Sequence, residues 1–394
     1  MKSLIAIALI FSTLQLYAQK EYTIEGKLTG IEDSTEISLF QDDGNVFSNI
    51  ATDTIFGGKF KFRGKTEGLT HLVILSNAPG FPSKWLDVWV SPAVRIRITG
   101  NDKLLRTWLV ESPIKEQIET NRYTKATKSD MDKLQQLSVI RNTLTSRILE
   151  KGSTDQRKKI KASIDSVDQK QDSITAIIHR AEIRLLETSP VTSIWIDKLK
   201  TIAMDVKYNK KSVLREPTLA LFNRLDKKQK ESAVGQEIYT SLFPPKVVKK
   251  GEPMADKALK DLEGKQHFLA DYKGKHLLLD FWSLGCGPCI MAMPELRKLS
   301  SSYTDSLTVV SLSVDVKKEL WRKATESQKV TWVNLSDGLG MSGIAAQYGV
   351  RGIPHYVLIS PEGKIISSWT GFSEGDLEKR IKKLIFKDQQ PATQ

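Results

Sequence analysis

The sequence contains very little cysteine: Cys286 and Cys289 are the only two in 394 residues. Structural zinc needs four nitrogen or sulfur ligands, and catalytic zinc needs three plus a water. No second CxxC pair is present and the five histidines show no paired spacing, so we predict neither a metal site nor a cofactor. A purely structural disulfide is also a weak explanation, because closing so short a loop contributes only about 1.9 kcal/mol.

Long hydrophobic runs are also missing, since no segment reaches the ~20 apolar residues of a membrane-spanning helix. Residues 1–18 carry one basic residue, an apolar run from Leu4 to about Leu16, and a small residue at Ala18. This layout predicts a secretory signal peptide cleaved after about Ala18. We therefore expect a protein of the periplasm or cell envelope without stable membrane insertion; an uncleaved N-terminal anchor is the alternative. A lipoprotein is excluded, because no cysteine lies near the cleavage site.

Acidic residues are outnumbered, and the formal net charge of +13 becomes +12 without Lys2 of the predicted signal. Apart from QRKKIK at 156–161, the basic residues are dispersed. An exported protein rarely meets nucleic acid, so we predict no nucleic-acid partner. The charge is better explained by solvated faces, with weak attraction to an anionic membrane surface.

Two different periodicities divide the first 245 residues. In 19–112, segments such as VRIRIT (94–99) alternate apolar and polar residues between Gly-rich turns, which predicts an antiparallel β-sandwich-like accessory domain. In 113–245, apolar residues recur at alternating steps of four and three from Ile160 to Leu185, a heptad seam interrupted by Gln171. This predicts an α-helical region with a helical hairpin, whose seam packs within the chain or binds a partner helix.

From about 250 to 390, strand and helix patterns alternate, which indicates an α/β domain with a mixed sheet. HLLLDFW (276–282) is nearly all apolar, as expected for a strand buried on both faces. Both cysteines follow it, at the start of a predicted helix. The fold class is therefore multidomain α and β: β-sandwich-like, then helical, then α/β.

The position of the two cysteines favours a redox couple. At a helix N-terminus, unpaired N–H groups and the macrodipole stabilise a thiolate at Cys286. Cys289, one turn further, is expected to be the shielded resolving thiol, and Pro288 is tolerated in the first turn. Asp280 lies near the end of the buried strand, where desolvation raises a carboxyl pKa and allows it to accept the proton of Cys289. An ordinary strand-end aspartate is the alternative.

Several motifs then resemble the thioredoxin superfamily, in family order and spacing. DFW (280–282), CGPC (286–289) and Pro294 resemble its active-site strand and helix, and YGVRGIPHYVLI (348–359) resembles the segment with its cis-proline. The lead-in from 251 and the stretch VVSLSVD to WVNLSDG resemble the exported TlpA/ResA-type, AhpC/TSA-related branch. The resemblance implies a thioredoxin-like domain over 250–390, with Pro354 facing the thiols. It also implies that Gly287, Pro288 and Ile353 bind substrate.

The sequence departs from this pattern around the cysteines. Gly285 replaces the usual tryptophan, Ile290 a lysine and Ala292 a glutamate, and His355 stands where threonine usually follows the proline. These changes predict an apolar, less guarded entrance. His355 is interpreted as tuning the thiolate, as forming a hydrogen bond, or as incidental.

We therefore predict an exported thiol–disulfide oxidoreductase that reduces disulfides of client proteins with electrons from a membrane thiol donor. Two alternatives stay open. One is a non-catalytic envelope protein that binds a partner or senses redox state. The other is a thiol peroxidase, favoured by Ser283 three residues before Cys286 but opposed by Leu279, where a peroxiredoxin has proline.

Overall fold

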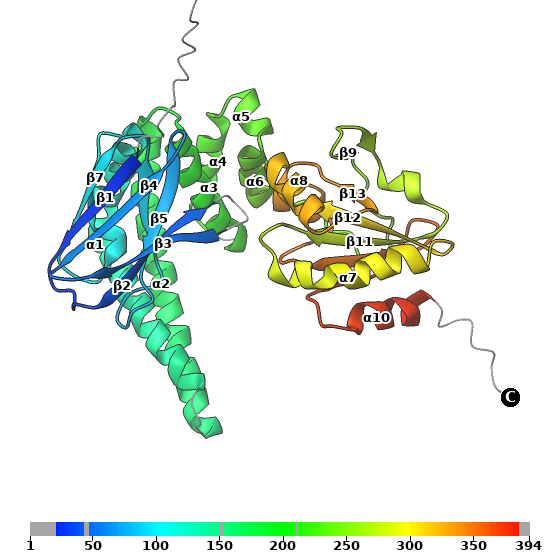
Figure 1. The fold of residues 1–394 in the computed structure, drawn as a ribbon, viewed down its shortest axis with the longest axis horizontal. Helices are drawn as coiled ribbons and strands as arrows, with labels where there is room; N and C mark the ends of the chain where they lie inside the picture. The colour runs from blue at the N-terminus through cyan, green and yellow to red at the C-terminus, as the bar shows by residue number, and fades with distance from the viewer. Residues whose placement is uncertain (1–20, 43–46, 150–152, 210–211, 386–394) are drawn as a thin grey trace, which may run out of the picture.

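The structure is a computed structural model that describes residues 21–42, 47–149, 153–209 and 212–385. The chain runs through a β-rich part, a helical part and an α/β part, and Figure 1 shows them side by side from blue through green to red. The predicted signal peptide, residues 1–18, lies outside the described residues. Within the described residues, no helix has both the length and the apolar character needed to cross a membrane.

The β-rich part consists of two four-stranded sheets with the orders β4-β1-β7-β8 and β3-β2-β5-β6. The strands are β1 (Glu21–Leu28), β2 (Thr35–Asp42), β3 (Phe47–Ile55), β4 (Lys59–Lys65), β5 (Thr70–Leu75), β6 (Leu86–Val90), β7 (Arg95–Gly100) and β8 (Leu109–Glu111), with η1 (Leu105–Thr107) before the last. Buried side chains from both sheets form one hydrophobic cluster. The cluster arises from the period-two pattern of the strands, which turns alternate side chains inward. In β7, for example, Ile96 and Ile98 are buried while Arg95 and Arg97 are exposed.

One strand pair differs from the antiparallel prediction. β1 pairs antiparallel with β4 but parallel with β7, with Ile24 opposite Ile96. After β4 the chain passes through β5 and β6 of the other sheet before it returns at β7. A parallel pair needs such a long crossover, which alternation along a single strand does not reveal.

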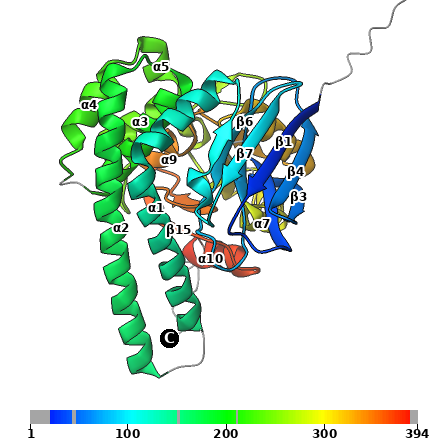
Figure 2. The same ribbon diagram turned by 90° about the vertical axis from the view of Figure 1, so that its left-hand side faces the viewer.

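The central part is helical, as predicted. Its helices are α1 (Lys115–Leu149), α2 (Thr154–Thr188), α3 (Ser193–Tyr208), α4 (Arg215–Asn223), α5 (Lys227–Glu231) and α6 (Ala233–Leu242). α1 and α2 form the long hairpin that projects below the rest of the molecule in Figure 2. The predicted seam is the protected face of α2, where Val167 and Ile178 are buried and none of the seam residues is fully exposed. It therefore packs within the chain, against α1.

The C-terminal part contains a five-stranded mixed sheet of order β13-β12-β11-β14-β15. Its strands are β11 (His276–Trp282), β12 (Leu307–Ser313), β13 (Val333–Leu335), β14 (His355–Ile359) and β15 (Ile365–Thr370), and β9 (Leu259–Lys260) pairs with β10 (Gln266–His267) before them. The helical elements are η2 (Leu269–Tyr272), α7 (Gly287–Ser302), α8 (Lys318–Ser327), η3 (Gly340–Ser342), α9 (Ile344–Gln347) and α10 (Asp376–Ile385). β11 is central and buried on both faces, because hydrophobic clusters cover each side of the sheet. This explains its unbroken apolar run.

Candidate active site

The two cysteines lie where β11 ends and α7 begins, and they form a disulfide with their Cα atoms 5.2 Å apart. Cys286 is the N-cap of α7, and its sulfur accepts a hydrogen bond from the backbone N–H of Cys289 at 3.1 Å. Cys286 is 7% exposed and Cys289 1%, while Gly287 and Pro288 between them are exposed. The N-terminus of α7 thus supplies N–H groups and a dipole that would stabilise a thiolate at Cys286.

Asp280 lies fully buried on β11, on the sheet face that carries the disulfide cluster. Its Oδ2 accepts a hydrogen bond from the Ser311 hydroxyl at 2.9 Å, and Trp332 Nε1 donates to that hydroxyl at 2.9 Å. Among the described residues Oδ1 has no hydrogen-bond partner. Burial raises the pKa of Asp280 to about 7, although the Ser311 hydrogen bond opposes the rise. Asp280 can therefore take up or release a proton near neutral pH.

Tyr356 is the cross-strand neighbour of Asp280, since the two residues face each other in the antiparallel β11–β14 pair. Its side chain is fully buried, and its hydroxyl has no hydrogen-bond partner among the described residues. Burial and the nearby Asp280 raise the pKa of Tyr356. The hydroxyl therefore stays protonated beside the carboxyl group.

The peptide bond between Ile353 and Pro354 is cis, as the resemblance implied. Ile353 packs against the cluster that contains both cysteines, and β14 begins at the residue after Pro354. The structure thus brings all seven predicted site residues to one end of the sheet.

His355 is hydrogen-bonded, through Nδ1 to Thr370 Oγ1 at 2.7 Å. Its ring centroid lies 6.0 Å from that of Phe281, which belongs to the cluster on the other side of the sheet from the cysteines. Burial lowers the pKa of His355. This position favours the hydrogen-bond interpretation over thiolate tuning.

Three further side chains near the site were not anticipated: Ser311, Trp332 and Asn334. Asn334 Oδ1 accepts from the indole N–H groups of Trp282 at 3.3 Å and Trp321 at 3.2 Å. The sequence does hold a signal for Ser311, because this serine interrupts an apolar run. The run forms β12, which pairs in parallel with β11 and places Ser311 opposite Asp280. The register of that pair, which identifies the partner, is not visible in the sequence.

Within the described part of the chain, no group of three or more histidine, cysteine, aspartate or glutamate side chains could hold a metal ion. The disulfide, the buried carboxyl group of Asp280 and the cis-proline characterise the site. On a mixed sheet with a central active-site strand, these features define a thioredoxin-like thiol–disulfide oxidoreductase.

Comparisons with known proteins agree with this class. The AhpC/TSA family profile matches residues 250–368. The thiol-disulfide oxidoreductase ResA of Geobacillus thermodenitrificans (strain NG80-2) is 30% identical over 156 residues, which are 39% of this chain and 88% of ResA. The thioredoxin-like protein YneN of Bacillus subtilis (strain 168) is 30% identical over 152 residues, 37% of this chain and 88% of YneN.

Among solved structures, the thioredoxin domain of a thiol-disulfide oxidoreductase from Bacteroides vulgatus is 31% identical. The match covers 35% of this chain and 99% of that one, with a TM-score of 0.33. On the strength of the sequence relatives, the chain belongs to the TlpA/ResA-type family of thioredoxin-like thiol–disulfide oxidoreductases.

Proposed function

We propose that the protein is an exported reductase of disulfides in client proteins. The observation that carries this proposal is the buried carboxyl group of Asp280, on the strand that leads into the Cys286–Cys289 pair. The sulfur of Cys286 caps the helix α7. A helix-capping thiol attacks disulfides, and a carboxyl group with a pKa of about 7 can exchange a proton with the second thiol.

In the proposed reaction, the Cys286 thiolate attacks one sulfur of a client disulfide. A mixed disulfide forms and the other client sulfur leaves as a thiolate. Cys289 then passes its proton to Asp280 and attacks Cys286, which releases the second client thiolate. Two electrons have moved to the client, and the enzyme is left with the Cys286–Cys289 disulfide. A thiol donor at the membrane then reduces this disulfide.

The substrate contacts belong to the same proposal. Gly287 and Pro288 are exposed beside Cys286 and would contact the client, while Pro354 and the backbone of Ile353 would align the client strand. The reducing direction is supported by the Gly-Pro pair between the cysteines, as in reducing thioredoxins. Export is supported by the signal-like sequence of residues 1–18.

The domain assignment is proposed with it: a β-sandwich-like accessory domain over 19–112, a helical region over 113–245 and the thioredoxin-like domain over 250–390. Separate hydrophobic clusters in the three regions support these bounds.

Insulin reduction tests the activity. Cys286→Ser should abolish reduction, whereas Cys289→Ser should accumulate mixed disulfides with the substrate. Full activity of Cys286→Ser would contradict the mechanism. A protein that only binds or senses a partner would form no mixed disulfide, and a thiol peroxidase would consume hydroperoxide faster than insulin disulfides.

The reduction potential of the pair tests the direction. A reductase should have a value near that of thioredoxin, about −270 mV, whereas about −120 mV would indicate an oxidant. Equilibration of the mature protein with mixtures of reduced and oxidised dithiothreitol measures it.

A further inference from the structure

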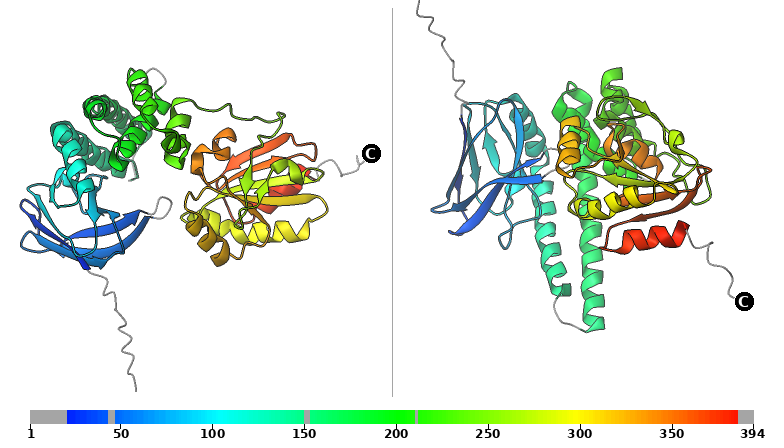
Figure 3. Two further views of the ribbon diagram at one scale, coloured as in Figure 1. Left: turned by 90° about the horizontal axis from the view of Figure 1, so that it is seen from above. Right: turned by 45° about the vertical axis from the view of Figure 1, so that its right-hand side comes forward.

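A large cavity lies between the three parts of the chain, with a volume of about 1140 Å³. Its floor is the outer face of β5 and β6: Leu72 and Ile74 point into the two-sheet core, whereas His71 and Val73 line the cavity. α3 and α6 form the side wall. The opposite wall is the loop after β12 together with η3, which packs against α6. Figure 3 shows the β-rich, helical and α/β parts that contribute the floor and the walls.

Exposed apolar side chains gather in this interdomain cavity. Phe47 and Trp85 come from the β-rich part and Val316 and Met341 from the α/β part, and they are 48%, 46%, 51% and 39% exposed. Large apolar side chains that line a cavity and remain open to solvent mark a binding site rather than a core.

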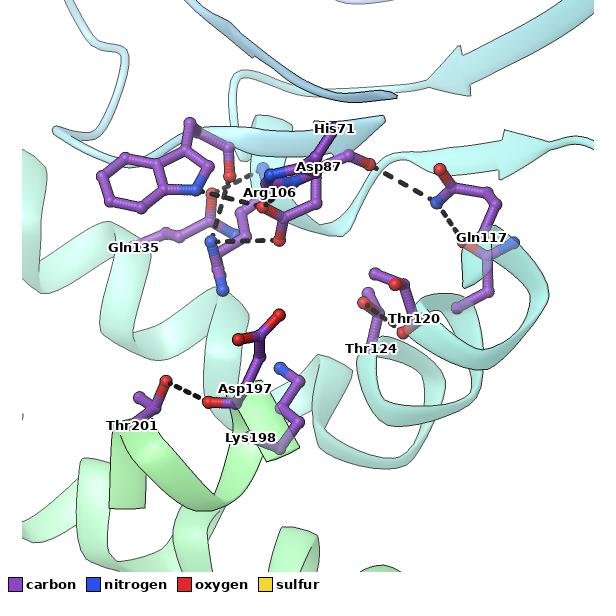
Figure 4. Close-up of polar contacts among 12 residues, drawn as sticks. His71, Asp87, Arg106, Gln117, Thr120, Thr124, Gln135, Asp197, Lys198 and Thr201 are labelled. Carbon is purple, nitrogen blue, oxygen red and sulfur yellow. Dashed lines mark hydrogen bonds and ion pairs between the residues drawn. The ribbon is translucent and has the colours of Figure 1, made fainter. Parts of the chain in front are cut away.

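A cluster of charged groups occupies the floor of the cavity (Figure 4). Asp87 Oδ1 lies 3.2 Å from His71 Nε2 and accepts from Trp85 Nε1 at 3.1 Å, and Arg106 lies 3.7 Å from Oδ2. Burial acts to raise the pKa of Asp87, but Arg106 and His71 outweigh it and hold the pKa well below its usual range. Figure 4 shows the carboxylate of Asp197 on α3 directed toward this cluster.

One residue of the cavity lining is hydrogen-bonded to the end of the strand that precedes the disulfide. The N–H of Val314, which lines the cavity, donates to the carbonyl of Trp282 at 2.9 Å. The next residue, Asp315, accepts at 3.1 Å from the N–H of Leu284, two residues before Cys286. Because β11 and β12 are parallel, their carboxyl ends meet at one edge of the sheet. Val314 and Asp315 thus link the cavity wall to the segment that leads into Cys286.

We infer that the interdomain cavity binds an extended segment of the disulfide-bearing client polypeptide and presents its cystine to Cys286. This inference rests on the proposed function and assigns the place where the client polypeptide binds. The cavity exceeds the roughly 300–1,000 Å³ of ordinary small-molecule sites. Its apolar walls suit side chains, and its charges of both signs suit the donors and acceptors of a peptide backbone. A nucleic acid would instead require a predominantly basic lining.

Paired variants test the inference. Val316→Glu places a charge on the apolar wall, and Val213→Glu is its matched control at a site that is 70% exposed and does not line the cavity. Trp85→Ala is matched by Phe56→Ala, whose side chain is 75% exposed outside the cavity. All four variants should be checked for wild-type melting temperature.

The readout is the rate constant for oxidation of the reduced enzyme by scrambled ribonuclease A, divided by that for a small disulfide, dithiobis(nitrobenzoate). We expect this ratio to fall about fivefold or more in Val316→Glu and in Trp85→Ala, and to stay at the wild-type value in both controls. An unchanged ratio in the two cavity variants would overturn the inference, as would an equal fall in the controls.

A second measurement separates this inference from the redox proposal. Reduced, carboxymethylated ribonuclease A has no disulfide, so its binding to Cys286→Ser requires no redox chemistry. If the cavity binds polypeptide, adding Val316→Glu should raise the Kd about fivefold, and adding Val213→Glu should not. If carboxymethylated ribonuclease A binds as expected but the wild type does not reduce insulin, only the proposed function is contradicted. Equal affinity in both double variants would contradict the cavity assignment alone.

Discussion

Asp280 is the residue whose protonation links stability to the redox site. Its carboxyl group is fully buried, and its pKa of about 7 lies far above the ordinary value of 3.8. A carboxyl group with a raised folded-state pKa contributes most stability below pH 3.8, and this contribution is lost as the pH rises through about 7. The oxidised wild type should therefore become less stable between pH 4 and pH 8.

We expect Asp280→Asn to remove this loss, because asparagine does not ionise. At pH 9 the variant should be more stable than the wild type by up to roughly 4 kcal/mol, the free energy equivalent of the pKa shift. Urea unfolding at pH 5 and pH 9 measures the difference, with Asp305→Asn at an exposed position as the control. A gain of the same size at both pH values would contradict the assigned pKa.

Ser311 should lower the pKa of Asp280, since its hydroxyl donates to the ionised carboxylate at 2.9 Å. Ser311→Ala should therefore raise this pKa further and shift the pH dependence of the resolving step to higher pH. The rate of mixed-disulfide resolution as a function of pH measures the shift, and Ser301→Ala at an exposed position of α7 should leave the profile unchanged. A downward shift would show that the hydrogen bond favours the neutral acid.

At the scale of elements, Asn334 connects β13, β11 and α8. Its Oδ1 accepts from Trp282 and Trp321, and its Nδ2 donates to Thr325 Oγ1 at 2.8 Å. Trp282 and Trp321 are both buried, so each indole N–H would be left unpaired without this oxygen. Unpaired buried donors cost about 1–3 kcal/mol each.

Asn334→Leu should therefore lower the free energy of unfolding by about 2–4 kcal/mol, because two buried donors lose their acceptor. Urea unfolding measures this. The matched control is Asn142→Leu, which removes one exposed hydrogen bond to Ser83 and should change stability by less than about 0.5 kcal/mol. Equal effects of the two substitutions would show that the tryptophans find other partners.

Several elements could be predicted from the sequence because local signals determine them. The apolar run of β11, the cysteine and proline at the start of α7, and the heptad seam of α2 each specify one element. The parallel β1–β7 pair and the contacts of Ser311, Tyr356 and Asn334 depend on register between strands far apart in sequence. A single sequence does not encode register locally, so these were not predicted.

At the scale of the molecule, residues 243–247 connect the helical part to the α/β part. The side chain of Lys246 is 82% exposed. From Val248 onward the segment is held by the α/β part, since Val248 N–H donates to the Gln347 carbonyl at 2.9 Å and Met254 N–H to the Gly363 carbonyl at 2.8 Å.

Limited trypsin digestion should therefore release a protected fragment that begins at Val247, because cleavage after Lys246 breaks none of these hydrogen bonds. Mass spectrometry identifies the new N-terminus, and Lys246→Gln should prevent its formation. Degradation of the α/β part without such a fragment would contradict a domain boundary near residue 250.

The two sulfurs of the disulfide differ in solvent access, and the chain has no other thiol. After reduction, an alkylating reagent should modify Cys286 before Cys289, since only the former reaches the surface. When the reagent is added without prior reduction, an oxidised molecule takes up no label and a fully reduced molecule takes up two, without background from other cysteines of the chain. The intact mass of the purified wild-type protein therefore gives the oxidised fraction without any cysteine substitution.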